Sequence, residues 1–145
     1  MSVGGQEPEQ LPAEELARLR ETFARVPYVG LLGFEFVRAG RGAATFALDV
    51  RVELTRMGGI LHGGAVVSLL DTAAAFAVHT VIEPEARTVT VDLTVHFLRP
   101  ASDGCIEAHA RVLRRGRRVC ILSVEALDAN AEIIATSTMT YFIQT

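Results

Sequence analysis

The sequence contains no tryptophan, and aromatic residues of all kinds make up only 6% of its 145 positions. Its two cysteines, Cys105 and Cys120, form no Cys-x-x-Cys pair, and both lie within apolar runs. That setting favours buried thiols in a reducing compartment, with a disulfide or a reactive thiol as the alternative. Charged residues are also few, at 21%, and the net charge is −3. This balance argues against a general nucleic-acid-binding protein.

Several motifs of membrane, metal and nucleotide chemistry are missing too. The most apolar stretch, 65–78, is too short to span a bilayer and contains Asp71. No basic segment followed by an apolar one marks the N-terminus, so we expect no signal peptide and a cytoplasmic protein. The histidines lack metal-ligand spacing, so no metal is expected. Without a Gly-x-Ser-x-Gly elbow, phosphate loop or dinucleotide fingerprint, neither a serine hydrolase nor a bound nucleotide cofactor is predicted.

The apolar residues that are present exceed what a small core needs. Half of the residues are hydrophobic, and most of these are alanine, valine, leucine and isoleucine. A domain of this size has limited interior in which to bury them. We therefore expect part of the apolar surface to lie in a subunit interface, which predicts a homo-oligomer.

Hydrophobic periodicity predicts one domain over 11–145, preceded by a disordered tail over 1–10 that is rich in Gly, Gln and Glu. A helix is expected over about 12–26, because Pro12 and two acidic residues mark its start and Pro27 its end. Alternation with a period of two predicts the strands, which are 34–38, 43–53, 89–97, 105–113, 119–127 and 133–143. Short turns join the last three strands, which predicts an antiparallel meander.

The segment 65–80 is expected to form a second helix, and it is apolar on nearly every side. A helix of this kind must be buried, and only the sheet is available to cover it. The predicted architecture is therefore α+β, a curved antiparallel sheet wrapped around one long buried helix.

Asp71 is the most unusual residue of that helix, because its neighbours are almost all apolar. Burying an unpaired carboxylate costs several kcal/mol. One interpretation is a structural carboxylate that bonds to Ser68 and Thr72, which lie on the same helical stripe. The other is a carboxylate aimed into a cleft, where it serves as a nucleophile or a general base.

His62-Gly63-Gly64 comes just before the buried helix. Consecutive glycines allow a ligand to approach the backbone closely, although many such pairs are only tight turns. The N–H groups at a helix start are unpaired and carry the positive end of the helix dipole. They suit a polarised carbonyl or an oxyanion.

Taken together, a glycine-rich entry, His62-Gly63-Gly64 and Asp71 nine residues after the histidine form a rare combination. In residues 57–73 the sequence resembles the phenylacetate-pathway (PaaI-like) branch of the hotdog-fold thioesterases. A second matching stretch is 89–101, which resembles that family's central strand with its exit at Pro100. The order of elements agrees from about Leu31 to the end.

The resemblance implies an acyl-CoA thioesterase, with coenzyme A as part of the substrate and no tightly held cofactor. It gives Asp71 the role of attacking the thioester or activating water, and Gly63 the N–H that polarises the carbonyl. It implies that His62 shapes the oxyanion region and that Thr90 orients the water or the aspartate. It also implies sites built across a dimer interface, with dimers that commonly pair into tetramers.

One departure from the family concerns Arg56, which stands where many members carry an Asn that helps to position the nucleophile. Arg56 could instead bind a phosphate or pair with a carboxylate. Arg117 and Arg118 belong to an arginine cluster around Gly116, which is either a solvated hairpin tip or a clamp for the phosphates of coenzyme A. Arg99 and Gly64 are further candidates for substrate binding.

Two other activities fit the same fold. One is a non-catalytic hotdog protein that binds acyl-CoA, which Arg56 favours, and the other is a hotdog dehydratase acting on acyl thioesters. His79, His96 and His109 are interpreted as ordinary surface or interface residues. The acyl group, aryl-acetyl or medium-chain, is left open, as are the choice between nucleophile and base for Asp71 and the arrangement of the tetramer.

Overall fold

The computed structural model describes residues 6–145. Its elements follow the predicted order of helix, two strands, buried helix and four strands, with one further helix before the first strand. They are α1 (Ala13–Ala24), α2 (Pro27–Leu32), β1 (Glu35–Gly40), β2 (Ala43–Asp49), the short 3-10 helix η1 (Val52–Leu54), α3 (Gly63–His79), β3 (Arg87–Phe97), β4 (Cys105–Arg115), β5 (Val119–Leu127) and β6 (Ile133–Gln144).

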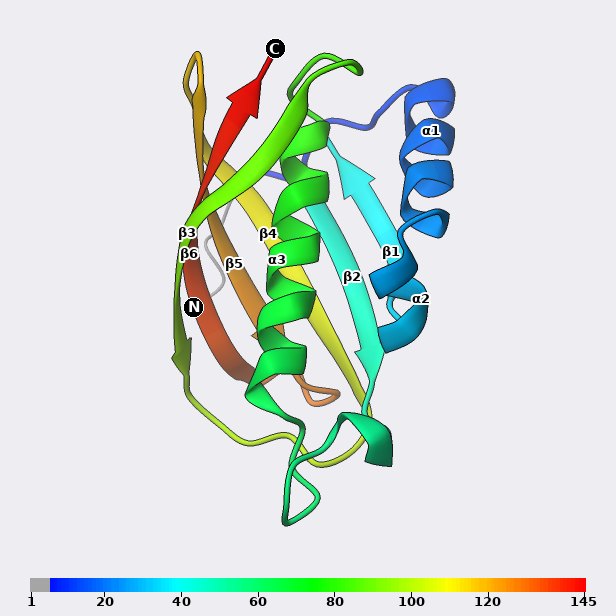
Figure 1. Cartoon of the computed structure of the whole chain (residues 1–145), viewed down its shortest axis with the longest axis vertical. Helices are drawn as coiled ribbons and strands as arrows, with labels where there is room; N and C mark the ends of the chain where they lie inside the picture. The colour runs from blue at the N-terminus through cyan, green and yellow to red at the C-terminus, as the bar shows by residue number, and fades with distance from the viewer. Residues whose placement is uncertain (1–5) are drawn as a thin grey trace.

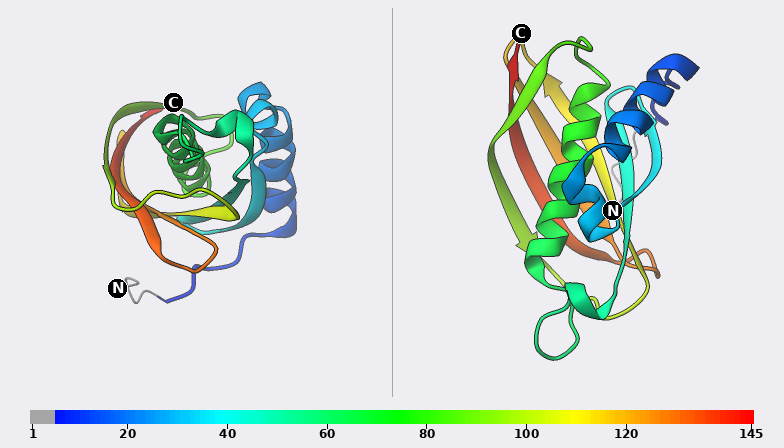
Figure 2. Two further views of the ribbon diagram at one scale, coloured as in Figure 1. Left: turned by 90° about the horizontal axis from the view of Figure 1, so that it is seen from below. Right: turned by 45° about the vertical axis from the view of Figure 1, so that its right-hand side comes forward.

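The six strands form one antiparallel sheet in the order β1-β2-β4-β5-β6-β3. Figure 1 shows α3 lying across the concave side of this sheet, and the view from below in Figure 2 shows the sheet curving around it. The predicted α+β architecture and the β4-β5-β6 meander are therefore confirmed. β3 and β1 are the two edge strands, so each leaves one side of its backbone unpaired by the sheet.

The core lies between α3 and the concave face of the sheet. Leu69, Leu70 and Ala74 of α3 are completely buried, as are Leu122 and Met139 on the sheet. Each leucine buried in this way contributes about 1.5–3 kcal/mol relative to an exposed one. The alanines of α3 allow the strands to approach the helix closely, so one helix can fill the curve of the sheet.

The N-terminal helices extend this core toward β1. Phe23 of α1 contacts Phe36, Phe46 and Phe76, with ring centroids 5.0–5.7 Å apart. α1 ends at Ala24, two residues before the predicted end at Val26, and Pro27 begins α2, where a proline at the first helical position costs no hydrogen bond. This short helix was not predicted, and it ends at Gly33 in the left-handed conformation.

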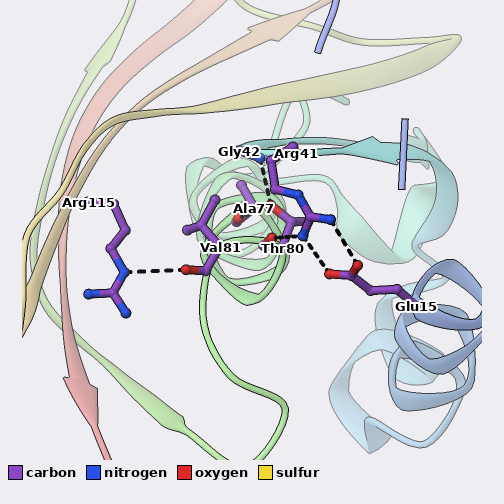
Figure 3. A network of polar contacts seen from close by, with 7 residues as sticks. All are labelled: Glu15, Arg41, Gly42, Ala77, Thr80, Val81 and Arg115. Carbon is purple, nitrogen blue, oxygen red and sulfur yellow. Dashed lines mark hydrogen bonds and ion pairs between the residues drawn. The ribbon is translucent and has the colours of Figure 1, made fainter. Parts of the chain in front are cut away.

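A polar network ties α1 and the β4-β5 hairpin to the C-terminal end of α3 (Figure 3). Arg41 forms a two-fold ion pair with Glu15, at 2.7 and 3.0 Å, and donates to the carbonyl of Thr80. Arg115 Nε donates to the carbonyl of Val81 at 3.3 Å. Two guanidinium groups therefore satisfy carbonyls at the negative end of the α3 dipole.

The predicted tail has two parts. Residues 1–5 lie outside the described residues. Residues 8–10 contact the end of β1 instead of extending into solvent: Gln10 bridges Gly40, and the carbonyl of Glu9 accepts the N–H of Arg41 at 2.8 Å. Both cysteines are free thiols, and burial raises the pKa of each. No helix in the described part of the chain is both long and apolar enough to cross a membrane.

Candidate active site

The start of α3 presents one unpaired backbone N–H. His62 is the N-cap, and its Nδ1 accepts the N–H of Gly64 at 2.8 Å. This bond fixes the tautomer with the proton on Nε2. Within residues 6–145, no acceptor lies within hydrogen-bond reach of the N–H of Gly63. Of the two glycines, Gly63 therefore has the N–H available to a substrate, whereas that of Gly64 is already used.

Close packing explains why both positions are glycine. A Cβ atom on Gly63 would lie 3.3 Å from Cζ of Phe97, and one on Gly64 would lie 2.9 Å from Nδ1 of His62. The second distance is too short for real atoms, so a side chain at Gly64 would displace the histidine that caps the helix. The two glycines thus keep the helix start both capped and open.

Asp71 lies midway along α3 and points toward the sheet. Its Oδ1 accepts a 3.0 Å hydrogen bond from Thr90 Oγ1 of β3 and a very short one from the Tyr141 hydroxyl of β6. The same hydroxyl lies 2.7 Å from the carbonyl oxygen of Asp71. No donor of the described residues reaches the other carboxylate oxygen, Oδ2. One oxygen is therefore anchored, and the other is available for chemistry.

Tyr141 is the site residue that sequence reasoning missed. Its hydroxyl is held under α3, and burial, followed by the charge of Asp71, raises the pKa of Tyr141 well above its usual value. The hydroxyl therefore stays protonated and remains a donor to the carboxylate at any physiological pH. Its position 70 residues after Asp71 gave no local signal.

Thr90 reaches Asp71 because of an irregularity in β3. Strict alternation predicted Thr90 on the face opposite to Leu93. The structure instead pairs Thr90 with Tyr141 and Asp92 with Thr140, so Val91 is an extra residue in the strand. This bulge shifts the alternation by one, and Thr90 and Leu93 both face α3.

Two separate cavities serve the two parts of the site. Gly63 lines a cavity of about 320 Å³, together with Arg56, Arg99 and the ring of Phe97. Asp71 lines a groove of about 290 Å³ between α3, β3 and the N-terminal helices. The structure therefore brings Arg56 and Arg99 to the Gly63 end of α3, and Thr90 to Asp71.

The remaining predicted residues lie elsewhere. Arg118 lines a third cavity, with Arg87 and Glu85, near the C-terminus of the chain, and Arg117 lies at the tip of the β4-β5 hairpin. Because Arg115 of this hairpin bonds to Val81, the tip is next to the C-terminal end of α3, away from Gly63. A phosphate clamp at Arg117 and Arg118 stays a prediction.

Gly63 and Asp71 do not meet within one chain. They are eight residues apart on one straight helix, which separates them by about 12 Å at 1.5 Å per residue. A single thioester carbonyl cannot contact the Gly63 N–H and the Asp71 carboxylate of the same α3. Within residues 6–145, no three His, Cys, Asp or Glu side chains are grouped to hold a metal ion.

An antiparallel sheet curved around one helix, with a capped glycine start and a mid-helix carboxylate, defines a hotdog-fold protein. Residues 58–135, more than half of the chain, match the family model of the thioesterase superfamily, and the chain belongs to that family. It is a hydrolase that acts on thioesters.

Similar proteins and structures agree over most of the chain. A putative esterase of Saccharolobus solfataricus is 30% identical over 132 residues, which cover 91% of this chain and 87% of the relative. The medium/long-chain acyl-CoA thioesterase YigI of Escherichia coli is 31% identical, with 92% and 97% covered. A thioesterase family protein from Silicibacter pomeroyi superposes with a TM-score of 0.84 at 30% identity, covering 90% of this chain and 98% of that one. Escherichia coli PaaI shares the fold, with a TM-score of 0.82 at 20% identity, covering 90% and 94%.

Proposed function

We propose that this protein hydrolyses acyl-CoA thioesters in a site shared by two subunits. Asp71 of one subunit supplies the carboxylate, and the Gly63 N–H of the other polarises the thioester carbonyl. The observation that carries the proposal is the state of the Asp71 carboxylate, with Oδ1 held by Thr90 and Tyr141 and Oδ2 open to the groove. The relative YigI, a medium/long-chain acyl-CoA thioesterase, supports acyl-CoA as the substrate class.

The edge strand β3 supports the second subunit. It is eleven residues long and unpaired on one side, and Val89, Val91 and Phe97 along it are 50–59% exposed. A long apolar edge strand invites pairing with another strand. Two β3 strands related by a two-fold axis would pair in antiparallel fashion and continue the sheet.

The same axis accounts for the spacing on α3. Two antiparallel copies of the helix that cross at Val67 place Gly63 of one beside Asp71 of the other, because Val67 is midway between them. Each dimer then contains two complete sites. The expected pairing of dimers into tetramers is a further proposal that this geometry does not require.

Within such a site the reaction needs only the residues already described. The Gly63 N–H at the positive end of the α3 dipole stabilises negative charge on the carbonyl oxygen. Oδ2 of Asp71 either attacks the carbonyl carbon, with loss of the thiolate, to give an anhydride that water then hydrolyses, or takes a proton from a water that attacks the carbonyl carbon and displaces the thiolate. His62 acts by capping the helix, so it is a positioning residue. Thr90 and Tyr141 hold the carboxylate in one orientation.

Thiol release from octanoyl-CoA and phenylacetyl-CoA tests the proposal. We expect Asp71→Asn to lower kcat by at least about 100-fold, within the range for loss of a positioned base. Asp103→Asn, the same change at an exposed loop aspartate, should leave kcat unchanged. If Asp71→Asn keeps more than a tenth of the wild-type rate, Asp71 has no catalytic role. Tight acyl-CoA binding without turnover in the wild type would favour the non-catalytic alternative.

Mixing two inactive variants tests the shared site. In a mixed dimer of Asp71→Asn and Gly63→Pro subunits, one of the two sites has both a wild-type Gly63 and a wild-type Asp71. Random association makes half of the dimers mixed, so co-refolded subunits should recover about a quarter of wild-type activity. No recovery, with mixed dimers shown by differently tagged subunits, would contradict a site built from two chains.

A single turnover in ¹⁸O-labelled water separates the two roles of Asp71. If Oδ2 attacks and water then opens the anhydride at the Asp71 carboxyl carbon, the first acid released carries an unlabelled oxygen from Asp71, and the label enters the aspartate. If Oδ2 acts as a base, or if water opens the anhydride at the acyl carbon, the label enters the acid directly, so label in Asp71 is the outcome that establishes attack by Oδ2. Mass spectrometry of the product and of the peptide containing Asp71 distinguishes these outcomes.

A further inference from the structure

The groove that holds Asp71 continues past it along α3 toward the C-terminal end of the helix. Val26 and Val29 of the N-terminal helices form one wall, and Ala75 and Phe76 of α3 form the floor. At the far end the lining becomes polar again, with Thr22, Thr88 and His79. The groove is thus apolar in the middle and polar at both ends.

The two cavities of the site differ in charge. The Gly63 cavity has two guanidinium groups, those of Arg56 and Arg99, which suit the phosphates of coenzyme A. Asp71 is the sole charged side chain among the described residues that line the Asp71 groove. Burial, and to a lesser degree the charge of Arg18, lowers the pKa of His79, which favours the neutral form of its ring. An uncharged acyl group therefore fits the groove, and the coenzyme fits the other cavity.

His79 has an imidazole with no hydrogen-bond partner among the described residues, although it is only partly exposed and lines the groove. From the sequence, His79 was expected to be an ordinary surface or interface residue. It lies eight residues beyond Asp71, which is about 12 Å along the helix. A hydrogen bond of about 3 Å to the ring leaves about 9 Å for the acyl chain. Since an extended chain advances about 1.2 Å per bond, this length corresponds to about six to eight carbons.

We infer that the acyl group lies in this groove and that His79 selects acyl chains of about six to eight carbons with an uncharged hydrogen-bonding group, such as a hydroxyl, at the far end. This inference rests on the proposed function, since it assumes that Asp71 is the reacting carboxylate. His79 is then a specificity residue that contacts the substrate remote from the reacting bond. A purely apolar chain would cover the half-buried imidazole and Thr88 without offering them a partner, which lowers its affinity.

Two matched substrate pairs test the assignment: hexanoyl-CoA against 6-hydroxyhexanoyl-CoA, and octanoyl-CoA against 8-hydroxyoctanoyl-CoA. The wild type should show a kcat/KM that is about three- to tenfold higher for the hydroxylated member of at least one pair, the gain expected for one partly exposed hydrogen bond. His79→Leu should abolish or reverse this preference, and His79→Gln should keep part of it. His96→Leu, the same change at an exposed histidine on the opposite face of the sheet, should not alter it.

A second variant tests the path of the chain without relying on the hydroxyl. Ala75→Phe fills the middle of the groove and should lower kcat/KM for the six- and eight-carbon substrates at least tenfold, while acetyl-CoA hydrolysis is retained. Ala75→Ser controls for the loss of alanine at that position.

The outcomes separate this inference from the function on which it rests. Equal kcat/KM for both members of both pairs, or a preference that survives His79→Leu, overturns the role of His79 and leaves the thioesterase intact. Unchanged chain-length dependence in Ala75→Phe overturns the placement of the acyl group. No thiol release from any of these substrates by the wild type overturns the proposed function, and the inference with it.

Discussion

Replacing Gly63 with proline exchanges one N–H for a ring carbon, Cδ, and leaves the other backbone groups of the helix start in place. Gly63 is the first residue of α3, the position at which proline is best tolerated in a helix, because the N–H there has no helical partner. His62 has φ −62° and ψ 135°, the extended conformation that a residue before proline prefers. The helix start is thus already shaped for proline, so Gly63→Pro should fold.

The structure also sets the size of the effect and its control. Loss of one donor to a developing oxyanion typically lowers kcat by about 10²–10³-fold, or about 2.7–4 kcal/mol. Any side chain at this position brings a Cβ to 3.3 Å from Cζ of Phe97, so the ring must shift by a few tenths of an ångström. Gly63→Ala introduces the same contact but keeps the N–H. The ratio of the two variants therefore measures the loss of the N–H together with the space that the proline Cδ takes in its place.

The assay is thiol release from octanoyl-CoA, with chemical denaturation of both variants as the measure of folding. We expect Gly63→Pro to be at least about 100-fold slower than Gly63→Ala, with unfolding free energies within about 1 kcal/mol of each other. If the two variants are equally active, the Gly63 N–H does not polarise the carbonyl. A large difference in stability would instead attribute the loss to misfolding.

Three other predictions follow from the hydrogen bonds. Tyr141→Phe should lower kcat about 10–100-fold, because a hydrogen bond to a charged group is worth about 1.5–3 kcal/mol. The control is Tyr28→Phe, since the Tyr28 hydroxyl bonds only to Ser68, and equal kcat values for the two variants would exclude Tyr141 from the site. Ser137→Ala should be neutral or should raise the unfolding free energy in urea by about 1 kcal/mol, since the buried Oγ has no partner within the described structure. A fall in unfolding free energy of more than about 1 kcal/mol would show that the hydroxyl has a hydrogen-bond partner. The hydrogen bond from Arg41 lowers the pKa of Glu15, so the ion pair stabilises the fold fully above about pH 4.5 and this stabilisation is lost as the pH falls further. Below that pH the wild type should lose more unfolding free energy than Glu15→Gln, and parallel plots of unfolding free energy against pH would contradict this.

The outline of the fold could be predicted because each element carried its own pattern. The strand predicted over 119–127 has the bounds that the structure shows, and most of the other strands agree to within a few residues. The exception is the strand predicted over 43–53, because β2 ends at Asp49. There the chain turns into η1, although Val50 and Val52 continue the alternation. Alternation alone cannot show where a strand stops pairing, because the pattern is the same in a short loop that follows it.

The site was predictable only where its residues were unusual for their local setting. Asp71 stood out among apolar neighbours, and Gly63 followed a histidine at the start of a helix. Tyr141 lies on the inner face of β6, where an aromatic residue is ordinary, and its function depends on a contact across the core. Thr90 was named through the family resemblance, whereas the alternation rule placed it on the wrong face. A one-residue bulge has no signature in the sequence of β3 itself.

The proposed shared site accounts for the apolar surface that the chain exposes at one edge. Val89, Val91 and Phe97 lie along β3, the strand that also carries Thr90 to Asp71. A protein selected only for solubility would shorten or charge such an edge. In the proposed dimer, the bulge that aims Thr90 at Asp71 and the pairing that would bring in a second Gly63 belong to the same strand, so charging the edge would separate the two halves of the site. On this proposal the apolar edge is the structural consequence of dividing the carbonyl-binding N–H and the carboxylate between two copies of one helix.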